Sequence, residues 1–504
     1  MEFLTSHSLS TILILLSLGA GAVALFDMEE QRARLISLST SILVLCVTLK
    51  QYFHLFDPSN TSPQLAESYD WIGPMKFSLA VDGLSFSMVL LTAILLPCVI
   101  IASQPIAERR QPRLFYSLIM LLALAVMAVF MAKDLFLFFL AWELELVPMY
   151  FLIAIWGSKN RNYASMKFLL YTFAAGIALL IGVFWLLSVT GFTSFDMVEL
   201  SKLTTQLGEG TQMGIFLLFA VCFIIKLPSV PFHTWLPDAH VEAPTPVSML
   251  LAGILLKMGC YGLIRFSLNF FPDVVQQLAP AIAILAAVNI IYGAYAALIQ
   301  TDLKKVIAYS SISHMGFILL GLASLNTAGY SGAVFQMFSH GLISAALFMI
   351  VGMIYERTHT REISDFGGLA KVMPQTFYLF VLAAMANLAL PGLSGFVGES
   401  LVFYGVFSNE MAHGYDPIKI AAAVSALGVI LTAAYMLWIN QRVFYGEIKD
   451  KWLELTDARR SEITVLGVLL GLSILYGIYP SYINNIYEPQ LDSLAQLSIP
   501  SLIS

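Results

Sequence analysis

The sequence predicts an all-α polytopic membrane protein with about 14 transmembrane helices, comprising two inverted five-helix repeats, each with one broken helix. Three observations support this fold class. Of 504 residues, 59% are hydrophobic. Only 12% are charged, which is about half the charged share of a typical soluble domain. Apolar runs of about 20 residues, the length that crosses a bilayer, follow one another along the chain.

The spans are placed in order by this length rule. The chain begins MEFLTSHS and continues into apolar sequence without the basic region and cleavage site of a leader peptide, so residues 10 to 26 are expected to be a retained first span. Further spans are expected near residues 35 to 54, 84 to 103, 114 to 132, 135 to 156, 168 to 190, 213 to 240, 245 to 266, 278 to 299, 305 to 325, 330 to 354, 376 to 408, 418 to 444 and 463 to 483. The longest connection, about 55 to 83, is expected to form at most a small cap.

The seventh and twelfth spans are overlong and contain helix-breaking residues, in the stretches FIIKLPSVPFHTWLPDAH and NLALPGLSGFVGES. Proline removes a backbone donor and clashes with the preceding turn. Such a break at membrane depth survives only inside protein or beside a wet cavity. Interrupted helices at matching places in two halves are typical of inverted repeats built around an ion path.

This layout divides the chain into four parts. Residues 1–113 are an N-terminal three-helix segment, 114–267 the first five-helix repeat, 268–446 the second, and 447–504 the last helix and tail. The repeat is inferred from helix layout, because the two halves share no strong residue-level identity.

Lysine and arginine counts predict the orientation. The odd connections, between spans one and two, three and four and so on, hold 18 of these residues, and the even connections hold five. Positive charge is enriched on the cytoplasmic side. The odd connections are therefore expected there, with both termini on the opposite side.

The sequence excludes several kinds of site. The four cysteines lie far apart in apolar segments, and none forms a zinc or iron–sulfur spacing. There is no GxGxxG after a strand and no P-loop. No cofactor is expected in this chain, and any chemistry is expected within the membrane.

Two glutamates occupy the fifth span, in FFLAWELELVPMYFL. A carboxylate at membrane depth costs about 2.5 to 3.5 kcal/mol on insertion scales, so an intramembrane ionisable residue is a functional hypothesis by default. Glu143 and Glu145 are about 200° apart around a helix and must face different ways. We favour Glu143 for the interior path over an inert partnered carboxylate, and the inert role for Glu145.

Two lysines are further candidates. Lys226 lies two residues before Pro228, where the helix is expected to open, although a terminal lysine can also reach the interface by snorkelling. Lys257 lies near mid-membrane in LLAGILLKMGCYGLI, out of reach of either surface. Burial disfavours its ammonium form, so this lysine can lose and regain a proton near neutral pH.

The second break is followed by Glu399, expected as a relay group, with a structural carboxylate as the alternative. Imidazole titrates near neutrality and suits proton shuttling. For His240, His314 and His340, a relay role and a hydrogen-bonded core role are weighed equally, whereas His233 is favoured as a core residue.

One ion pair follows as a hypothesis. Opposite charges 4 Å apart at an effective dielectric of 20 attract by about 4 kcal/mol, which is of the same order as the cost of burying one. A pair of Glu143 and Lys226 would therefore be near balance, and a neighbouring charge would make or break it.

Five stretches carry a family resemblance: WELELVPMYFLIAIWG, KLPSVPFHTWLPDAH, MLLAGILLKMGCYGLIRF, LKKVIAYSSISHMGFILLG and LALPGLSGFVGE. In these, the sequence resembles the antiporter-like proton-pumping subunits of respiratory complex I. It looks closest to chain 4, the D-type subunit, of the type I NAD(P)H dehydrogenase (NAD(P)H-quinone oxidoreductase) complexes of cyanobacteria and plastids. The likeness runs from about 114 to 446.

The resemblance implies a proton path made of Glu143, Lys226, Lys257 and Glu399, with relay histidines His240, His314 and His340. It also implies an oxidoreductase complex whose NAD(P)H or ferredoxin, iron–sulfur clusters and plastoquinone are bound by partner subunits. Other membrane subunits, hydrophilic redox subunits and the bilayer are the expected partners, without nucleic acid.

The resemblance places the chain in the cyanobacterial thylakoid membrane, with a bacterial inner membrane as the alternative. Residues 1 to 80 and the loop 191 to 212 look less like common members, and the form that supports carbon dioxide uptake is slightly favoured over the respiratory one. Three alternative functions stay open: a subunit of a sodium/proton antiporter, the equivalent chain of a membrane-bound hydrogenase, and a purely structural anchor.

Overall fold

The computed structural model describes residues 7–104, 110–408 and 416–498. The chain forms two compact units. Unit 1 consists of Met1–Leu227, Ile254–Leu278 and Asn485–Ser504, and unit 2 of Pro228–Gly253 and Ala279–Asn484. These units are defined by packing and not by repeat symmetry, so the four-part division of the chain stays a prediction.

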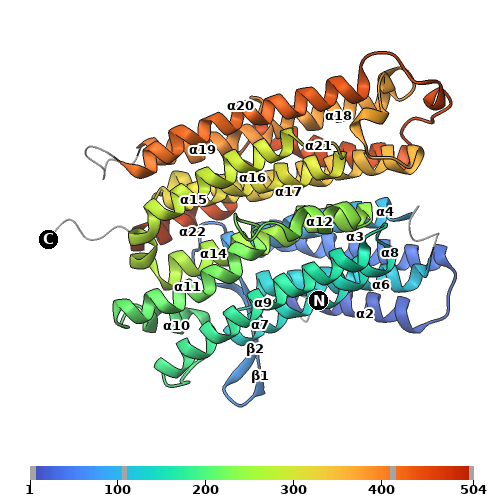
Figure 1. The fold of residues 1–504 in the computed structure, drawn as a ribbon. Coiled ribbons are helices and arrows are strands. Elements are labelled where there is room, and N and C mark those ends of the chain that lie inside the picture. Colours follow the sequence, from blue (N-terminus) through green and yellow to red (C-terminus); the bar gives the residue numbers. More distant parts are fainter. Residues whose placement is uncertain (1–6, 105–109, 409–415, 499–504) are drawn as a thin grey trace. The chain divides into compact units, whose positions relative to one another are not determined.

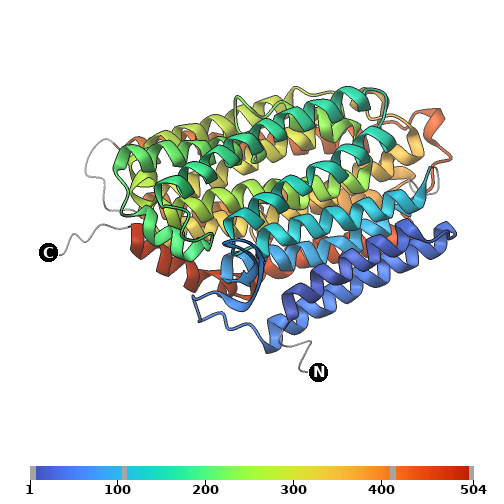
Figure 2. The ribbon, with the colours of Figure 1, turned by 90° about the horizontal axis from the view of Figure 1, so that it is seen from below.

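Unit 1 is a bundle of membrane helices with a small β-hairpin (Figure 1). The first helices, α2 and α3, pack side by side, and α2 also packs on α6 (Figure 2). Its elements are α2 (Ser8–Leu25), α3 (Glu30–His54), β1 (Gln64–Ile72), β2 (Met75–Val81), α4 (Gly83–Ala102), α6 (Pro112–Met131), α7 (Leu135–Leu144), α8 (Leu146–Trp156), α9 (Arg161–Val189), α10 (Met197–Thr204), α11 (Glu209–Lys226), α14 (Leu256–Phe270) and most of α22 (Ser481–Ser498).

Unit 2 has α17 at its centre, packed against α16, α19 and α21. Its long helices are joined by short connections with single 3₁₀ turns at Ile363–Asp365, Leu369–Lys371 and Asp450–Trp452. The helices are α12 (Trp235–Glu242), α13 (Thr245–Leu250), most of α15 (Pro272–Leu298), α16 (Leu303–Ala323), α17 (Thr327–Thr358), α18 (Pro374–Asn387), α19 (Ser394–Ser408), α20 (Pro417–Phe444) and α21 (Arg460–Ile478). A π-helical turn, Leu251–Leu255, leads from α13 into α14.

The predicted fold class is confirmed. Thirteen segments within the described residues are long and apolar enough to cross a membrane, and α7 with α8 counts as one of them. The short helices α18 and α19 occupy the remaining predicted span, 376 to 408. Exposed apolar side chains along α9 recur every three or four residues, at Leu170, Phe173, Ile177 and Ile181, as expected of a face turned to lipid.

Aspartate side chains begin several of these helices. Asp134 Oδ1 accepts the backbone N–H of Phe136 at 2.8 Å and of Leu137 at 3.0 Å at the start of α7. Asp302 and Asp416 do the same for α16 and α20. The first backbone N–H groups of a helix have no partner within it, so such caps supply the missing acceptors.

The predicted break in the seventh span separates α11 from α12. The backbone between them is held by Asn289 of α15, whose side chain accepts the Val230 N–H at 2.8 Å and donates to Ser229 Oγ at 2.8 Å. Backbone groups freed at membrane depth need such partners. The second predicted break separates α18 from α19, where Ala389 and Gly392 have positive φ angles.

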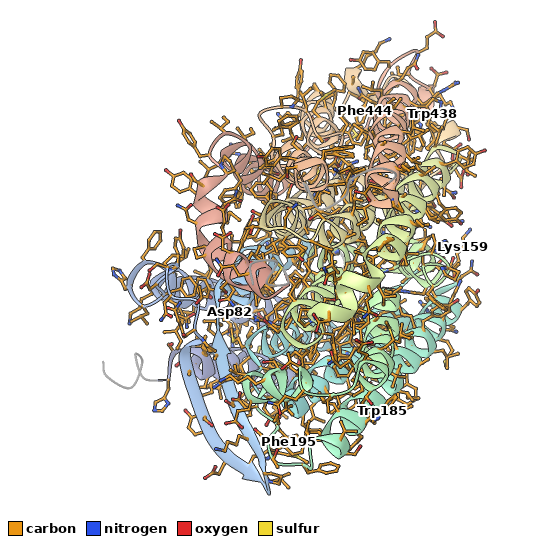
Figure 3. The ribbon with its side chains drawn as sticks, turned by 90° about the vertical axis from the view of Figure 1, so that its left-hand side faces the viewer. Asp82, Lys159, Trp185, Phe195, Trp438 and Phe444 are labelled. Atoms are coloured by element: carbon orange, nitrogen blue, oxygen red, sulfur yellow. The ribbon has the colours of Figure 1, made fainter. Side chains whose placement is uncertain are left out.

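The predicted cap over residues 55 to 83 contains the β-structure. Strands β1 and β2 pair antiparallel, Gln64 with Val81 and Ile72 with Met75. Figure 3 shows Asp82 where β2 leads into α4. Asp82 caps α4 through Ser85 N at 3.0 Å and forms a two-point ion pair with Arg265 of α14, with Nη1–Oδ2 2.5 Å and Nη2–Oδ1 2.6 Å. Burial acts to raise the pKa of Asp82, but the Arg265 guanidinium and the capping bonds hold it below its usual value.

Candidate functional site

Lys226 is the last residue of α11, and its side chain is buried, with 1% of its area exposed. Its Nζ donates to Glu145 Oε1 and forms an ion pair with it. Two aromatic rings lie near the ammonium group: Phe168 of α9, with its centroid 5.4 Å from Nζ, and Trp142 of α7, at 5.8 Å. The ammonium group is therefore held by a carboxylate and two aromatic faces, which attract cations.

Glu145 lies between α7 and α8 and is fully buried. Pro148, three residues later, has no N–H to donate to the carbonyl of Leu144, the last residue of α7. The helix is interrupted at Glu145 for this reason.

Glu143 is half-buried and faces α9, where its carboxylate lies directly against Gly176. Its Oε1 is buried and makes no hydrogen bond within the described part of the chain. The predicted pair of Glu143 and Lys226 is therefore wrong for this structure, since Glu145 holds the lysine. The two carboxylates have different neighbours, but both lie against protein: Glu143 against Gly176 of α9, and Glu145 against Lys226 of α11.

Lys257 is fully buried and lies in the first turn of α14, just after the π-helical turn. Two residues later, Gly259 packs against the end of α11. A Cβ there would be 2.8 Å from Phe223 O and 2.7 Å from Leu227 N. Because no larger residue fits, the helices that carry Lys226 and Lys257 approach backbone to backbone.

In unit 2, three helices bring polar groups together around His314 of α16. Its Nδ1 lies 3.2 Å from Glu399 Oε1 of α19 and 3.2 Å from Gln336 Nε2 of α17. The His340 ring of α17 is centred 5.6 Å from the His314 ring. Three predicted site residues, His314, His340 and Glu399, therefore form one buried cluster.

Hydroxyl groups continue this polar region. One turn before His314 on α16, Ser310 Oγ accepts from Tyr435 Oη at 2.8 Å and from Asn387 Nδ2 at 3.2 Å. At the start of α19, Ser394 Oγ lies 2.7 Å from Ser339 Oγ and 2.8 Å from Ser473 Oγ. These groups can donate and accept protons in hydrogen bonds.

The remaining predicted residue, His240, lies in α12 with its ring stacked on Phe348 at 4.3 Å. Its backbone carbonyl accepts from Ser248 Oγ at 3.2 Å. His233, favoured as a core residue, is buried, and its Nε2 lies 3.2 Å from Tyr292 Oη.

Two cationic side chains from other segments donate to carbonyl groups at the C-terminal end of α12. Lys304 Nζ donates to Ala243 O at 2.6 Å, and Arg361 Nη1 donates to Val241 O. Arg361 Nε also lies 3.2 Å from Asp302 Oδ2. The free carbonyls and the dipole of a helix C-terminus favour such partners.

The family model described as "NADH:quinone oxidoreductase/Mrp antiporter, TM" matches residues 132–439, and "NADH-ubiquinone oxidoreductase chain 4, amino terminus" matches 33–129. NAD(P)H-quinone oxidoreductase chain 4 1 of Nostoc sp. is 43% identical over 475 residues, covering 93% of this chain and 87% of the relative. Its namesake from Synechococcus elongatus is 44% identical over 491 residues, with 97% and 91% covered. The chain belongs to the chain 4 family of NAD(P)H-quinone oxidoreductases.

Solved structures show the same fold. A chain of respiratory complex I from Thermus thermophilus is 26% identical, with a TM-score of 0.87 over 97% of this chain and 100% of that one. A chain of the Mrp complex from Dietzia sp. is 20% identical, with a TM-score of 0.86 over 98% and 99%, which shows the shared fold. As a member of the chain 4 family, this protein is an antiporter-like membrane subunit of a complex I-type oxidoreductase.

Sequence reasoning missed two groups in this chain 4 family member. Lys304 was counted as a loop lysine, but it is buried in unit 2. The hydroxyl groups around Ser310 and Ser394 were also missed. One signal in the sequence could have indicated them: Ser310 and His314 are four residues apart and therefore share a face of α16.

Proposed function

We propose that this chain carries protons through a buried Glu/Lys/His relay while partner subunits pass electrons from NAD(P)H or ferredoxin to a quinone. The observation that supports the relay is the placement of its titratable residues beside interrupted helices. Lys226 ends α11 at the first break, and Glu399 lies in α19 just after the second. Both side chains are buried, as an internal path requires.

In unit 1, the relay begins at the lysine–carboxylate pair. Opposite charges about 4 Å apart at an effective dielectric of 20 attract by about 4 kcal/mol. Burying each of the two charges in a membrane costs about 2.5 to 3.5 kcal/mol, which for the pair is of the same order as this attraction. The Lys226–Glu145 pair is therefore near balance, and a change in a neighbouring charge opens or closes it. Lys257, on the adjacent helix α14, is the next group that takes up and gives back a proton.

In unit 2, the proton passes between imidazole and carboxylate. Glu399 Oε1 lies 3.2 Å from His314 Nδ1, close to hydrogen-bond reach. The Gln336 amide lies against the same nitrogen and orients the ring. His340 extends the relay along α17, and His240 along α12.

The redox cofactors of this function are iron–sulfur clusters and plastoquinone, bound by partner subunits together with the electron donor. We place the complex in the thylakoid membrane of a cyanobacterium, and a bacterial inner membrane is the alternative. The names of the cyanobacterial relatives support this choice. We further propose the carbon dioxide uptake form, on the unusual character of residues 1 to 80 and 191 to 212.

A second candidate function is a subunit of a sodium/proton antiporter, favoured only by the fold shared with the Mrp complex. Gentle purification from the native membrane separates the two. Copurifying iron–sulfur subunits support the oxidoreductase, and a hydration subunit among them supports the uptake form. Sodium-dependent transport by a complex without redox subunits would instead support the antiporter. Copurifying hydrogenase subunits would identify the chain as part of a membrane-bound hydrogenase.

The relay itself is tested by proton translocation per electron in the intact complex, reconstituted into vesicles. Lys257→Met and Glu399→Gln are expected to lower this ratio about tenfold or more, because a positioned proton donor or acceptor is lost. Lys202→Met, at an exposed position of α10, is the matched control. Unchanged translocation in both buried variants would leave only the structural-anchor role.

A further inference from the structure

The fifth span brings two carboxylates to one lysine. Glu145 holds Lys226, while Glu143 Oε1 is buried against Gly176 and makes no hydrogen bond within the described residues. Both carboxylates interact electrostatically with Lys226. The thiol of Cys222, one turn earlier on α11, also interacts with all three.

The charges of this cluster do not balance if both carboxylates are ionised. One ammonium group neutralises one carboxylate, and a thiol contributes no positive charge. A second ionised carboxylate at this depth would be buried without a counter-charge, which is strongly unfavourable. One of the two carboxyl groups therefore carries a proton whenever the lysine is charged.

The lysine is placed where it can change partners. Lys226 is the last residue of α11, followed by Leu227 and by Pro228, whose φ is +24°. The rings of Trp142 and Phe168 are centred 5.8 and 5.4 Å from Nζ and offer the ammonium group two π-faces besides the carboxylate. The end of α7 at Leu144 separates the two glutamates.

We propose that Glu145 is a second exchangeable carboxylate partner of Lys226, and that the lysine alternates between Glu145 and Glu143. In the present arrangement Glu145 is ionised and Glu143 carries the proton. When the lysine moves to Glu143, that carboxyl group releases its proton toward Lys257, and Glu145 takes up another. Each arrangement contains one ammonium, one carboxylate and one carboxylic acid, so the net charge of these three groups does not change while a proton passes to the neutral amine of Lys257.

This inference rests on the proposed function and assigns its first step to three residues. The test uses the intact reconstituted complex, with two measurements: protons moved per electron, and infrared difference spectra between resting and turning-over enzyme. The variants are Glu143→Gln, Glu145→Gln and their double, with Glu199→Gln at an exposed position of α10 as the matched control.

Alternation predicts two carboxyl bands of opposite sign, one removed by Glu143→Gln and the other by Glu145→Gln. Each single variant is expected to lower protons per electron about tenfold or more. The double variant is expected to lower this ratio no further, because each single variant already abolishes the alternation of Lys226. If Glu145 were only a fixed counter-ion, it would stay ionised. Glu145→Gln would then remove no band, and that result would overturn the inference.

Assembly of each complex is checked on native gels. If Glu145→Gln fails to assemble, Glu145→Asp replaces it, because it keeps the charge. A shift of one carboxyl band in Glu145→Asp supports alternation, and an unshifted spectrum contradicts it. Failure of the relay is distinguishable from failure of the alternation. Full pumping by both Lys257→Met and Glu399→Gln removes the proposed function, whereas inactive Lys257→Met with a fully active Glu145→Gln removes only the alternation.

Discussion

Gly176 of α9 lies directly beneath the carboxylate of Glu143. A Cβ at this glycine would overlap Glu143 Oε1 and would lie 3.2 Å from Oε2. A larger side chain fits here only if the Glu143 carboxylate moves aside, so the backbone of α9 limits where this carboxylate lies. A glycine of α9 therefore helps set the geometry of the cluster around Lys226.

Gly176→Ala is expected to displace the Glu143 carboxylate and to lower protons moved per electron, while quinone reduction continues. The added methyl group is small and helix-favouring, so assembly on native gels should be retained. Gly21→Ala in α2, with open space around its Cβ, is the control. Equal pumping by the two variants would mean that the position of Glu143 does not matter.

Asn289 holds the backbone of the first break. In Asn289→Leu, the partly buried Val230 N–H loses its acceptor, and an unsatisfied donor costs about 1 to 3 kcal/mol when fully buried. Thermal unfolding of the purified complex should therefore begin at a lower temperature. Asn162→Leu, at an exposed position of α9, serves as the reference. An unshifted transition would show that the break is held by other contacts.

Lys304→Met removes one of the two cations at the end of α12. A hydrogen bond from a charged donor contributes about 1.5 to 3 kcal/mol, and here it anchors the short helix that follows the break. Faster backbone hydrogen exchange in α12 is expected, measured by mass spectrometry. The neighbouring Lys305→Met, half-buried, is the matched variant, and identical exchange in the two would refute the anchoring role.

Arg265→Leu leaves Asp82 buried without its cation. Removing one partner of a buried ion pair destabilises a protein by about 3 to 5 kcal/mol. The exposed pair of Arg113 and Asp27 provides the comparison, with an N–O distance of 2.8 Å, because exposed pairs contribute about 0 to 1 kcal/mol. Denaturation midpoints of Arg265→Leu and Arg113→Leu should differ clearly. Similar midpoints would contradict the assigned role.

Asp457 anchors the start of α18, accepting the backbone N–H of Gln375 at 2.8 Å and of Thr376 at 3.1 Å. Partial burial acts to raise its pKa, but these hydrogen bonds hold the pKa below its usual value. A lowered folded pKa stabilises the fold above the unfolded value of about 3.9, and the stabilisation is lost as the pH falls through the folded value.

The thermal stability of Asp457→Asn should therefore fall below that of the unmodified chain at neutral pH. The difference should shrink in acid below an ordinary aspartate pKa. Asp450→Asn, at an exposed position, is the control. A difference that does not depend on pH would exclude the ionised carboxylate as its source.

Much of the helical layout was predictable, because span length and apolar composition are imposed by the bilayer itself. The predicted span 135 to 156 and the observed Leu135–Trp156 coincide. Both broken helices also follow from local chemistry, since the proline and glycine clusters at these two places disfavour a continuous helix. The pattern of residues was sufficient for these features.

The partner of Lys226 was not predictable. Spacing around a helix shows that Glu143 and Glu145 face different ways, but it does not show that protein covers both faces. The buried position of Lys304 was not predicted, because it was counted among the lysines of the connections. The sequence does not show that its ammonium group donates to a carbonyl at the end of α12. The amphipathic helix α22 was treated as a tail because it is too polar for a span.

Helix α22 also bears on how the protein is made. Its backbone at Ile486 and Tyr487 packs so closely on Gly83 that a Cβ at this glycine would overlap it. Gly83 begins α4, and the part of unit 1 that starts at Asn485 leaves the ribosome much later. During translation, the early helices of unit 1 therefore lack this contact until a segment encoded about 400 codons downstream of Gly83 has been made.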